Sequence, residues 1–558
     1  MTTLRPREPY TPEELEKLYP ANLELRLVQV LLRHGERAPV SAGLAPYWPY
    51  CNAAQRMRSV VMSQNTSSWD SLQWRRRLER FGPDDGPIIA AGAGGQVDGI
   101  CQLGELTDQG RETTYALGQR LRHLYVDQLK FMPPLIANAD LIYLRATPMP
   151  RALESVQQSF WGMYPLTART ASFPAPTIVT RTPADETLFP NDSNCRRFAQ
   201  LGRMFAQRTA DRHNDTEDMR YLTKQIGRWM PETSKEVAVD SHPRLSGIMD
   251  TINSTLAHGP ETRLPKEFYD KKMAAIIDRI AVEEWFSGYT ESREYRKLGI
   301  GPLAGDIVER MISKVEGAGL SINEIGGENG RLGRGRGGEK GILFAMSGCH
   351  DTTLAALLTS LGAFDGEKWP PYTSHVAVEL FRKKAAGAIT PVDPTSASAP
   401  TSSTEKQAEE TQAPARPGFL SSMLGLSSSS PSAQKQHLNN ASTIPQPGAQ
   451  TQGIARRPWS EIPQHSKDKL SGYYVRLRFN DKVMTVPACK RPGNHLEGDE
   501  SFCTLETFKR VVDGYTPKNW KMECGMRLGE GAPGISNAKG AGPEEGEREW
   551  AGEIEVGS

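Results

Sequence analysis

The sequence lacks long hydrophobic runs and carries almost no net charge. None of its apolar stretches approaches the roughly 18–20 residues that a helix needs to cross a bilayer, so we expect no transmembrane segment. Its 67 Lys and Arg residues are balanced by 66 Asp and Glu residues, which gives a formal net charge of +1. General binders of nucleic acid or of membrane surfaces carry a strong basic bias. We therefore expect neither nucleic acid nor a membrane surface as a partner.

Cysteine is also scarce. The 558 residues include seven cysteines and no Cys-x-x-Cys pair. This small, odd number does not indicate a fold built on disulfides. The ten histidines show no metal-ligand spacing, so we expect no zinc site, no other metal and no cofactor.

The first residues lack the hydrophobic core of a signal peptide, and their glutamates are unlike a transit peptide. We therefore expect a cytoplasmic protein, with a mitochondrial location as the alternative, and no secretion. A hydrophobic content of 38% and a charged content of 24% are typical of a globular protein with polar additions. The length exceeds that of one ordinary domain.

One short stretch carries clear chemistry. The apolar run Leu27–Leu32 is typical of a strand that is buried on both faces of a sheet, and the motif Arg-His-Gly-x-Arg-x-Pro follows at Arg33–Pro39. The glycine and proline of the motif turn the chain away from the strand. Ligands of open α/β sheets bind at the carboxyl ends of strands. The motif therefore places His34 between Arg33 and Arg37 where a ligand is expected.

These residue types favour phosphoryl transfer. Guanidinium groups match phosphate oxygens, and two of them can share one phosphoryl group. An imidazole with an ordinary pKa of about 6.5 is largely neutral near neutral pH and can act as a nucleophile. A phosphate held by Arg33 and Arg37 and facing His34 can thus be transferred to nitrogen. The alternative is a surface turn, or a core histidine bonded to a backbone carbonyl.

A second motif repeats this arrangement. An apolar strand is predicted at residues 341–347, Gly-Cys-His350-Asp351 follows it, and a helix with leucines at i, i+3, i+4 and i+7 comes next. His350 and Asp351 are therefore also delivered at the end of a strand. The alternative role for Asp351 is that of a helix N-cap, which does not exclude catalysis.

A third block lies between a predicted strand at residues 139–144 and a predicted helix at 149–163. It reads Arg145-Ala-Thr-Pro-Met-Pro-Arg151-Ala-Leu-Glu-Ser155. Pro150 suits a first helical turn, which places Arg151 at the end of the helix that attracts anions. The alternative for Arg151 is a surface charge. A weaker block, Leu106–Gly110, leads into a helix that Thr107 is expected to cap.

The rest of the chain fits an α/β fold, a central and mainly parallel sheet flanked by helices, with an inserted and mostly α-helical cap domain. The expected parts are an N-terminal arm at 1–22, core at 23–190 with an insertion at 41–104, the helical cap at 191–303, core at 304–383, a disordered low-complexity insertion at 384–469, core at 470–524 and a disordered tail at 525–558. The low-complexity insertion is rich in Ser, Pro, Ala, Gln and Thr and cannot bury enough apolar surface to fold. It should leave from the tip of a hairpin, between strands predicted at 375–382 and 473–479.

Several segments allow two interpretations. The basic stretch 73–77 is interpreted as a helix with a solvated face rather than as an attractor of anionic substrates. Tyr47, Trp48, Tyr50 and Trp69 could line a pocket near the site or could pack the insertion. A Gly/Arg loop at 326–341 and an apolar island at 418–426 are interpreted as a flexible loop and as incidental hydrophobic residues, rather than as an RNA-binding and a docking segment.

With these blocks in place, the chain resembles the histidine acid phosphatases, a branch of the histidine phosphatase superfamily. The resemblance covers about residues 23–383 and 470–524 and rests on Arg33–Pro39, Arg145–Ser155 and His350–Thr353. It implies a nucleophile that forms a phosphohistidine, ligands of the phosphoryl oxygens and a proton donor to the leaving oxygen. Carried over by position, these are His34 as the nucleophile, Arg33, Arg37, Arg151 and His350 as phosphate ligands, and Asp351 as the proton donor.

The chain also departs from the family. The middle block of the family often has Arg-Ser-Thr-Asp where this chain has Arg-Ala-Thr-Pro. Secreted members of the family carry disulfides. Four cysteines of this chain lie near the positions of such disulfides and are expected either to form disulfides or to be buried thiols; they are Cys195, Cys489, Cys503 and Cys524. The opening Leu-Val-Gln-Val without a leader is most similar to the intracellular lysophosphatidic acid phosphatases.

We therefore expect a metal-independent phosphomonoesterase whose substrates are lysophosphatidic acid or other small phosphomonoesters. The alternatives are a phytase-like inositol phosphate phosphatase and a non-catalytic scaffold that binds phosphate and recruits a protein partner through 384–469. The ordinary pKa of Asp351, about 3.9, would leave it ionised at neutral pH. Either the site raises this pKa or activity falls above mildly acidic pH, and we expect the latter.

Overall fold

The computed structural model describes residues 9–41, 44, 48–62, 69–76, 78–81, 83–89, 99–317, 341–364, 368–384, 454, 457–526 and 551–554. The predicted Gly/Arg loop, the apolar island and nearly all of the tract expected to bind a protein partner lie outside these residues. Residues 1–384 and 452–558 form one compact unit.

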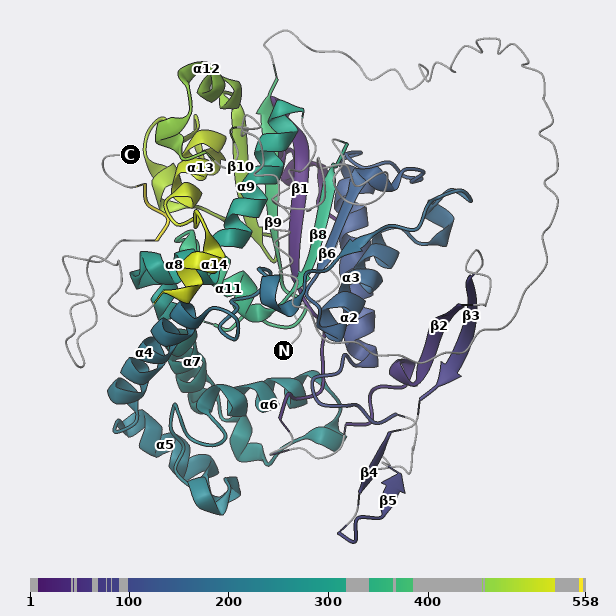
Figure 1. The fold of residues 1–558 in the computed structure, drawn as a ribbon, viewed down its shortest axis with the longest axis vertical. Helices are drawn as coiled ribbons and strands as arrows, with labels where there is room; N and C mark the ends of the chain where they lie inside the picture. Colours follow the sequence, from purple (N-terminus) through teal and green to yellow (C-terminus); the bar gives the residue numbers. More distant parts are fainter. Residues whose placement is uncertain are drawn as a thin grey trace, which may run out of the picture. The chain divides into compact units, whose positions relative to one another are not determined.

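A β-sheet with helices on both faces forms the centre of this unit (Figure 1). Its strand order is β12-β13-β10-β9-β1-β8-β6-β7, and β11 pairs with β10. The strands are β1 Leu23–Arg33, β6 Ile142–Ala146, β7 Ile178–Val179, β8 Phe344–Cys349, β9 His375–Lys383, β10 Tyr473–Phe479, β11 Lys482–Met484, β12 His495–Leu496 and β13 Asp499–Thr504. Strands β1, β8, β6 and β7 are parallel, and β9 begins an antiparallel extension on the other side of β1. The predicted α/β fold, a sheet flanked by helices, is confirmed.

The helices are α1 Pro12–Leu18, α2 Asp108–Arg122, α3 Pro150–Met163, α4 Arg196–His213, α5 Glu217–Ile226, α6 Leu245–Ala257, α7 Lys271–Glu291, α8 Arg293–Gly299, α9 Gly301–Glu316, α11 Asp351–Ser360, α12 Gln464–Lys467, α13 Leu505–Asp513 and α14 Trp520–Gly525. Helices α2 and α3 cover one face of the sheet, and α9 and α11 cover the other (Figure 1).

Strand β1 is buried on both faces from Leu27 to its end, as its largely apolar run Leu27–Leu32 predicts. Val28, Val30 and Leu32 belong to the core under α2 and α3. Leu27 and Leu31 belong to the core under α9 and α11. This burial fixes the register of β1, because a slip of one residue would exchange the two sets of side chains.

The register aligns the ends of three parallel strands. Arg33 at the end of β1 lies opposite Cys349 at the end of β8, and Gly348 lies opposite Ala146 at the end of β6. The three blocks singled out in the sequence follow these three ends. All three blocks therefore lie together at the carboxyl ends of the parallel strands.

The region predicted as a helical cap is helical, from α4 to α8, and α4, α5, α6 and α7 lie together at the lower left of Figure 1. It shares a hydrophobic core with the sheet. Phe198 of α4 and Phe286 of α7 belong to the same cluster as Leu354 of α11 and Val376 of β9.

The insertion at 41–104 contains β2 Arg56–Met62, β3 Trp69–Arg75, β4 Glu79–Phe81 and β5 Pro87–Ile89, in two antiparallel hairpins. The helix predicted around residues 73–77 was therefore wrong. Leu72 and Trp74 alternate with Ser71 and Gln73, and this period of two is the pattern of a strand.

Two further boundaries differ from the sequence analysis. Residues 457–469, assigned to the disordered insertion, include α12 and bury Trp459 and Ile462. In the predicted tail, Ala551 is buried and the carbonyl of Gly552 accepts a hydrogen bond of 3.0 Å from the amide of Ala488. Isolated apolar residues in a polar sequence are a weak signal, which composition alone does not resolve.

Six of the seven cysteines form disulfides, which corrects the expectation drawn from their number. The pairs are Cys51–Cys101, Cys195–Cys524 and Cys489–Cys503, and Cys349 is a buried thiol. Within the described ranges, no helix is both long and apolar enough to span a membrane.

Candidate active site

The motif loop after β1 brings three buried polar side chains together. Arg33, His34 and Arg37 are 4%, 2% and 6% exposed. The loop is held from the other side by residues 105–107, where the amide of Ala38 donates to the carbonyl of Glu105 at 3.0 Å. A buried loop with internal partners keeps its side chains in one geometry.

His34 has the tautomer that a nucleophile needs. Its Nδ1 lies 2.8 Å from the carbonyl oxygen of Gly35, and a carbonyl can only accept, so Nδ1 carries the proton and Nε2 keeps its lone pair. Burial, followed by the charge of Arg151 and of Arg33, holds the pKa of His34 well below its usual range. The ring therefore stays neutral in mildly acidic solution.

Arg33, Arg37 and Arg151 surround this ring with buried N–H donors. The Nε atoms of all three are buried and have no hydrogen-bond partner among the described residues. An unsatisfied buried donor is costly. Three of them beside one imidazole fit a site that is completed by an anion.

Arg151 lies where the sequence predicted. Helix α3 begins at Pro150, and Arg151 is in its first turn. Its Nη2 donates to the sulfur of Met149 at 3.3 Å, and burial and the neighbouring Arg37 lower its pKa to about 10. The guanidinium is still charged at neutral pH and has no carboxylate partner among the described residues. The alternative of a surface charge is not supported.

His350 and Asp351 meet the motif loop from β8. The ring centroids of His34 and His350 are 5.5 Å apart, and Nη2 of Arg33 lies 2.6 Å from a carboxylate oxygen of Asp351. Burial and the charge of Arg151 lower the pKa of His350 to about 3. His350, not Asp351, is the N-cap residue of α11, which corrects that alternative.

The carboxyl group of Asp351 is held by Arg33, by the indole of Trp369 at 2.9 Å and by the amide of Thr352 at 2.8 Å. Burial by itself would raise the pKa of Asp351, but Arg33, Trp369 and Arg37 outweigh it and lower that pKa. The structure therefore does not support the first alternative, that the site raises the pKa of Asp351.

The block at 145–155 forms hydrogen bonds with the other two blocks. The hydroxyl of Ser155 accepts a hydrogen bond of 3.1 Å from the amide of Gly35, and that of Thr147 pairs with Nε2 of His350 at 3.1 Å. Arg145 points elsewhere, to Glu186 at 2.8 Å and Asp306 at 3.2 Å, and is fully buried. Of the two arginines in this block, only Arg151 belongs to the site.

Two glycines let the first and fourth blocks touch. A Cβ on Gly35 would lie 2.7 Å from the carbonyl carbon of Gly110, and a Cβ on Gly110 would lie 2.8 Å from the amide nitrogen of Glu36. No side chain fits at either position without a shift of backbone. The start of α2, which Thr107 caps as predicted, is therefore packed directly against the motif loop.

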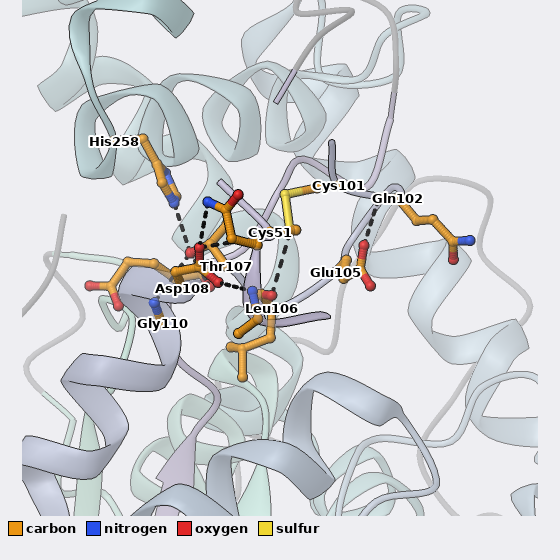
Figure 2. The surroundings of a disulfide bond; sticks show 12 residues. Cys51, Cys101, Gln102, Glu105, Leu106, Thr107, Asp108, Gly110 and His258 are labelled. Carbon is orange, nitrogen blue, oxygen red and sulfur yellow. Dashed lines mark hydrogen bonds between the residues drawn. A yellow bond between two sulfur atoms is a disulfide. The ribbon is translucent and has the colours of Figure 1, made fainter. Parts of the chain in front are cut away.

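The Cys51–Cys101 disulfide lies beside the segment that leads into α2, with Sγ of Cys51 3.6 Å from the carbonyl oxygen of Leu106 (Figure 2). Asp108 accepts hydrogen bonds from the amides of Asn52 and Ala53 at 2.9 and 2.8 Å, which ties the insertion to α2. Trp48 and Tyr50 pack around the ring of His258, each at 5.0 Å between centroids. These two aromatics therefore pack the insertion. Tyr47 and the side chain of Trp69 lie outside the description.

The sequence analysis missed three residues at the site. Asp250 of α6 forms a bidentate pair with Arg37, the ring of Tyr372 lies 4.1 Å beneath the guanidinium of Arg33, and Trp369 holds Asp351. No local pattern marks them, because the partner of each lies in another element; Asp250 is 213 residues from Arg37, and Trp369 is 18 residues from Asp351. Among the described residues, no group of three or more His, Cys, Asp or Glu side chains is placed to hold a metal ion.

Comparison with known proteins gives three results. The phytase of Hafnia alvei in complex with tartrate aligns over 91% of this chain and 100% of its own, with 11% identity and a TM-score of 0.47. A probable acid phosphatase of Schizosaccharomyces pombe is 34% identical over 91% of this chain and 95% of its own length. Lysophosphatidic acid phosphatase type 6 of Homo sapiens is 25% identical over 64% of this chain and 74% of its own.

The family model of the histidine phosphatase superfamily (branch 2) matches residues 24–401, more than half of the chain. That span contains all three sequence blocks and the strand ends that bring them together. The chain therefore belongs to branch 2 of the histidine phosphatase superfamily, with the histidine acid phosphatases, and it is a phosphomonoester hydrolase.

Proposed function

We propose that the chain hydrolyses phosphomonoesters through a phosphohistidine on His34. The observation that carries this proposal is the neutral, Nδ1-protonated ring of His34 beside three buried guanidinium groups with unpartnered Nε atoms. Arg33, Arg37 and Arg151 bind the phosphoryl oxygens, and His350 donates a further hydrogen bond. Their charges are fixed before the reaction, so they stabilise the transition state without reorganisation.

In the first step, the Nε2 lone pair of His34 attacks phosphorus, and the bond from phosphorus to the ester oxygen breaks. Asp351, in its acid form, gives its proton to that oxygen, and the alcohol leaves. In the second step, water attacks the phosphohistidine and gives a proton to Asp351. The bond from phosphorus to nitrogen breaks, and inorganic phosphate leaves.

The pKa values of His34 and Asp351 fit their roles as nucleophile and proton donor. Burial and the neighbouring arginines depress the pKa of His34, which keeps its ring a free base in mildly acidic solution. An arriving phosphate dianion offsets the charge of Arg33 and so raises the pKa of Asp351 in the complex. Nucleophile and proton donor can thus coexist in mildly acidic solution, which fits an acid phosphatase.

The physiological substrate that we propose is lysophosphatidic acid or another small phosphomonoester. Support comes from the relative in Homo sapiens whose name gives that substrate. A panel of lysophosphatidic acid, glycerol phosphates and inositol phosphates, assayed with the purified protein, tests this choice by the ratio of kcat/KM values.

We further propose that the protein works in an oxidising compartment rather than in the cytoplasm that we expected. Three disulfides within the family fold support this, because such bonds persist where thiols are not kept reduced.

The mechanism is tested with 4-nitrophenyl phosphate at acidic and neutral pH in the presence of a chelator. The parent protein should turn over, and His34→Ala should lose at least about a thousandfold in kcat, since the nucleophile is gone. His123→Ala, which changes an exposed histidine on the α2 side, is the matched control. A phosphoenzyme that is stable to alkali and labile to acid should form only when His34 is present. Full turnover by His34→Ala would refute the proposal.

A further inference from the structure

Helix α6 contacts the site along a single face. Asp250 and Ser254 are four residues apart and therefore lie on the same side of the helix, and His258 is the C-cap residue that follows it. Each contacts a different part of the site. Asp250 pairs with Arg37, the hydroxyl of Ser254 lies 2.8 Å from that of Tyr372, and Nε2 of His258 lies 2.9 Å from the hydroxyl of Thr107 (Figure 2).

These contacts hold Asp250 in place. Ser254 and His258 are buried, and Nδ1 of His258 bonds to the carbonyl of Ser254 at 2.8 Å. The rings of Trp48 and Tyr50 enclose His258. A carboxylate on a helix that is anchored one and two turns further along cannot move away without breaking buried bonds.

Asp250 forms a close pair with Arg37. Its carboxylate oxygens lie 2.7 and 3.1 Å from Nη2 and Nη1 of Arg37, and one also accepts the amide of Val40 at 3.3 Å. Nη1 of Arg37 donates to the carbonyl of Ala38 as well, at 3.0 Å. The buried Nε–H of Arg37 has no partner among the described residues and stays available for an anion.

The pair changes the charge of the site. Arg33, Arg37 and Arg151 contribute three positive charges, Asp250 removes one, and both histidines are neutral, which leaves +2 when Asp351 carries the proton that the proposed first step transfers. Glu36 forms no ion pair with these three arginines, and its carboxylate accepts a hydrogen bond from the hydroxyl of Thr113 of α2. A single phosphoryl dianion is therefore neutralised, and a second anionic group on the same substrate would meet the carboxylate of Asp250 with no free positive charge among these side chains.

We propose that Asp250 is a specificity-determining residue that restricts this site to substrates carrying one phosphoryl group and selects against polyanions such as inositol polyphosphates. This inference rests on the proposed function and names its substrate class. The role differs from that of a residue that only orients Arg37, because a positioning role would affect all phosphomonoesters equally.

The experiment compares kcat/KM for glycerol 2-phosphate and for inositol hexakisphosphate in the parent and in Asp250→Asn, which keeps the shape of the side chain and removes its charge. Removing one charge within a few ångströms of a polyanion should raise the ratio of inositol hexakisphosphate to glycerol 2-phosphate by about tenfold or more. Asp250→Glu keeps the charge and should leave the ratio within about threefold of the parent. Asp218→Asn, which removes the partner of Arg279 on the exposed α5, is the control.

The same comparison can be made without turnover. In a His34→Ala background, Asp250→Asn should tighten the binding of inositol hexakisphosphate, measured by calorimetry, about tenfold more than the binding of inorganic phosphate. An unchanged ratio in both kinetics and calorimetry would overturn the inference, as would equal loss on both substrates with equal loss of binding. A parent protein that fails to hydrolyse glycerol 2-phosphate or 4-nitrophenyl phosphate would instead defeat the proposed function, so the two failures are distinct.

Discussion

The contact between Gly110 and the motif loop provides a test of how tightly the site is positioned. Gly110 lies in the first turn of α2 and touches no reacting atom in the proposed mechanism. We consider the change Gly110→Ala. Its new methyl group would lie 2.8 Å from the amide nitrogen of Glu36, with the carbonyl oxygen of Glu36 nearer still.

The expected loss follows from this distance. Ordinary contact begins at 3.4 Å, so the motif loop must retreat by at least about 0.6 Å, and its carbonyl by more. His34 and Arg37 flank Glu36 and move with it. Misplacement of a reacting group by about 1 Å can lower the rate about 100-fold. We expect Gly110→Ala to lose between about tenfold and about 100-fold in kcat while the protein stays folded.

The assay is steady-state hydrolysis of 4-nitrophenyl phosphate, with the fold followed by circular dichroism and thermal melting. Gly202→Ala in α4 is the control, because its methyl group would make only ordinary contacts with the side chain of Tyr295, 3.5 Å from the hydroxyl and 3.9 Å from Cε2. That control should keep full activity. If Gly110→Ala also kept full activity with an unchanged melting temperature, the loop would be adaptable, and positioning by the two glycines would be refuted.

Three further predictions concern the proton donor and the cysteines. Asp351→Asn should lower kcat by about 10²–10⁴-fold on an alkyl phosphate and far less on 4-nitrophenyl phosphate, whose leaving group needs no proton; equal losses on both would contradict the role of Asp351. Since the pKa of Asp351 is lowered, kcat of the parent on the alkyl phosphate should fall as pH rises from mildly acidic to neutral, and a pH profile of Asp351→Asn should lack this decline. Thiol titration of the denatured protein should find one thiol, Cys349, before reduction and seven after it; seven at the start would place the chain in a reducing compartment.

The sequence was most informative where chemistry and secondary structure lie close together in the chain. Arg33–Pro39 and the pair His350-Asp351 each follow an apolar segment directly, so their position at the carboxyl ends of strands could be predicted from the sequence. Arg151 was predicted because Pro150 marks the start of a helix. The assignment of roles to these residues stays a prediction until the variants are measured.

The remainder depends on packing between distant segments. Asp250 reaches Arg37 from 213 residues away, and nothing near it in the sequence marks that meeting. Disulfide partners are equally remote, since Cys195 and Cys524 are 329 residues apart. The wrong prediction at β3, a helix in place of a strand, has a different cause. Its alternation of apolar and polar residues was visible, but the neighbouring run of arginines was given more weight.

The direction of β9 separates two parts of the protein. This strand starts at His375, beside the end of β1, and finishes at Lys383, opposite Leu23 at the start of β1. The chain thus leaves the fold at the sheet edge furthest from His34 and re-enters before β10. We expect a change of chain length directly after Lys384 to leave the phosphate ligands and α6 in place, because they lie at the opposite end of β1. Substrate choice and whatever the intervening tract does can consequently evolve as independent traits within one gene.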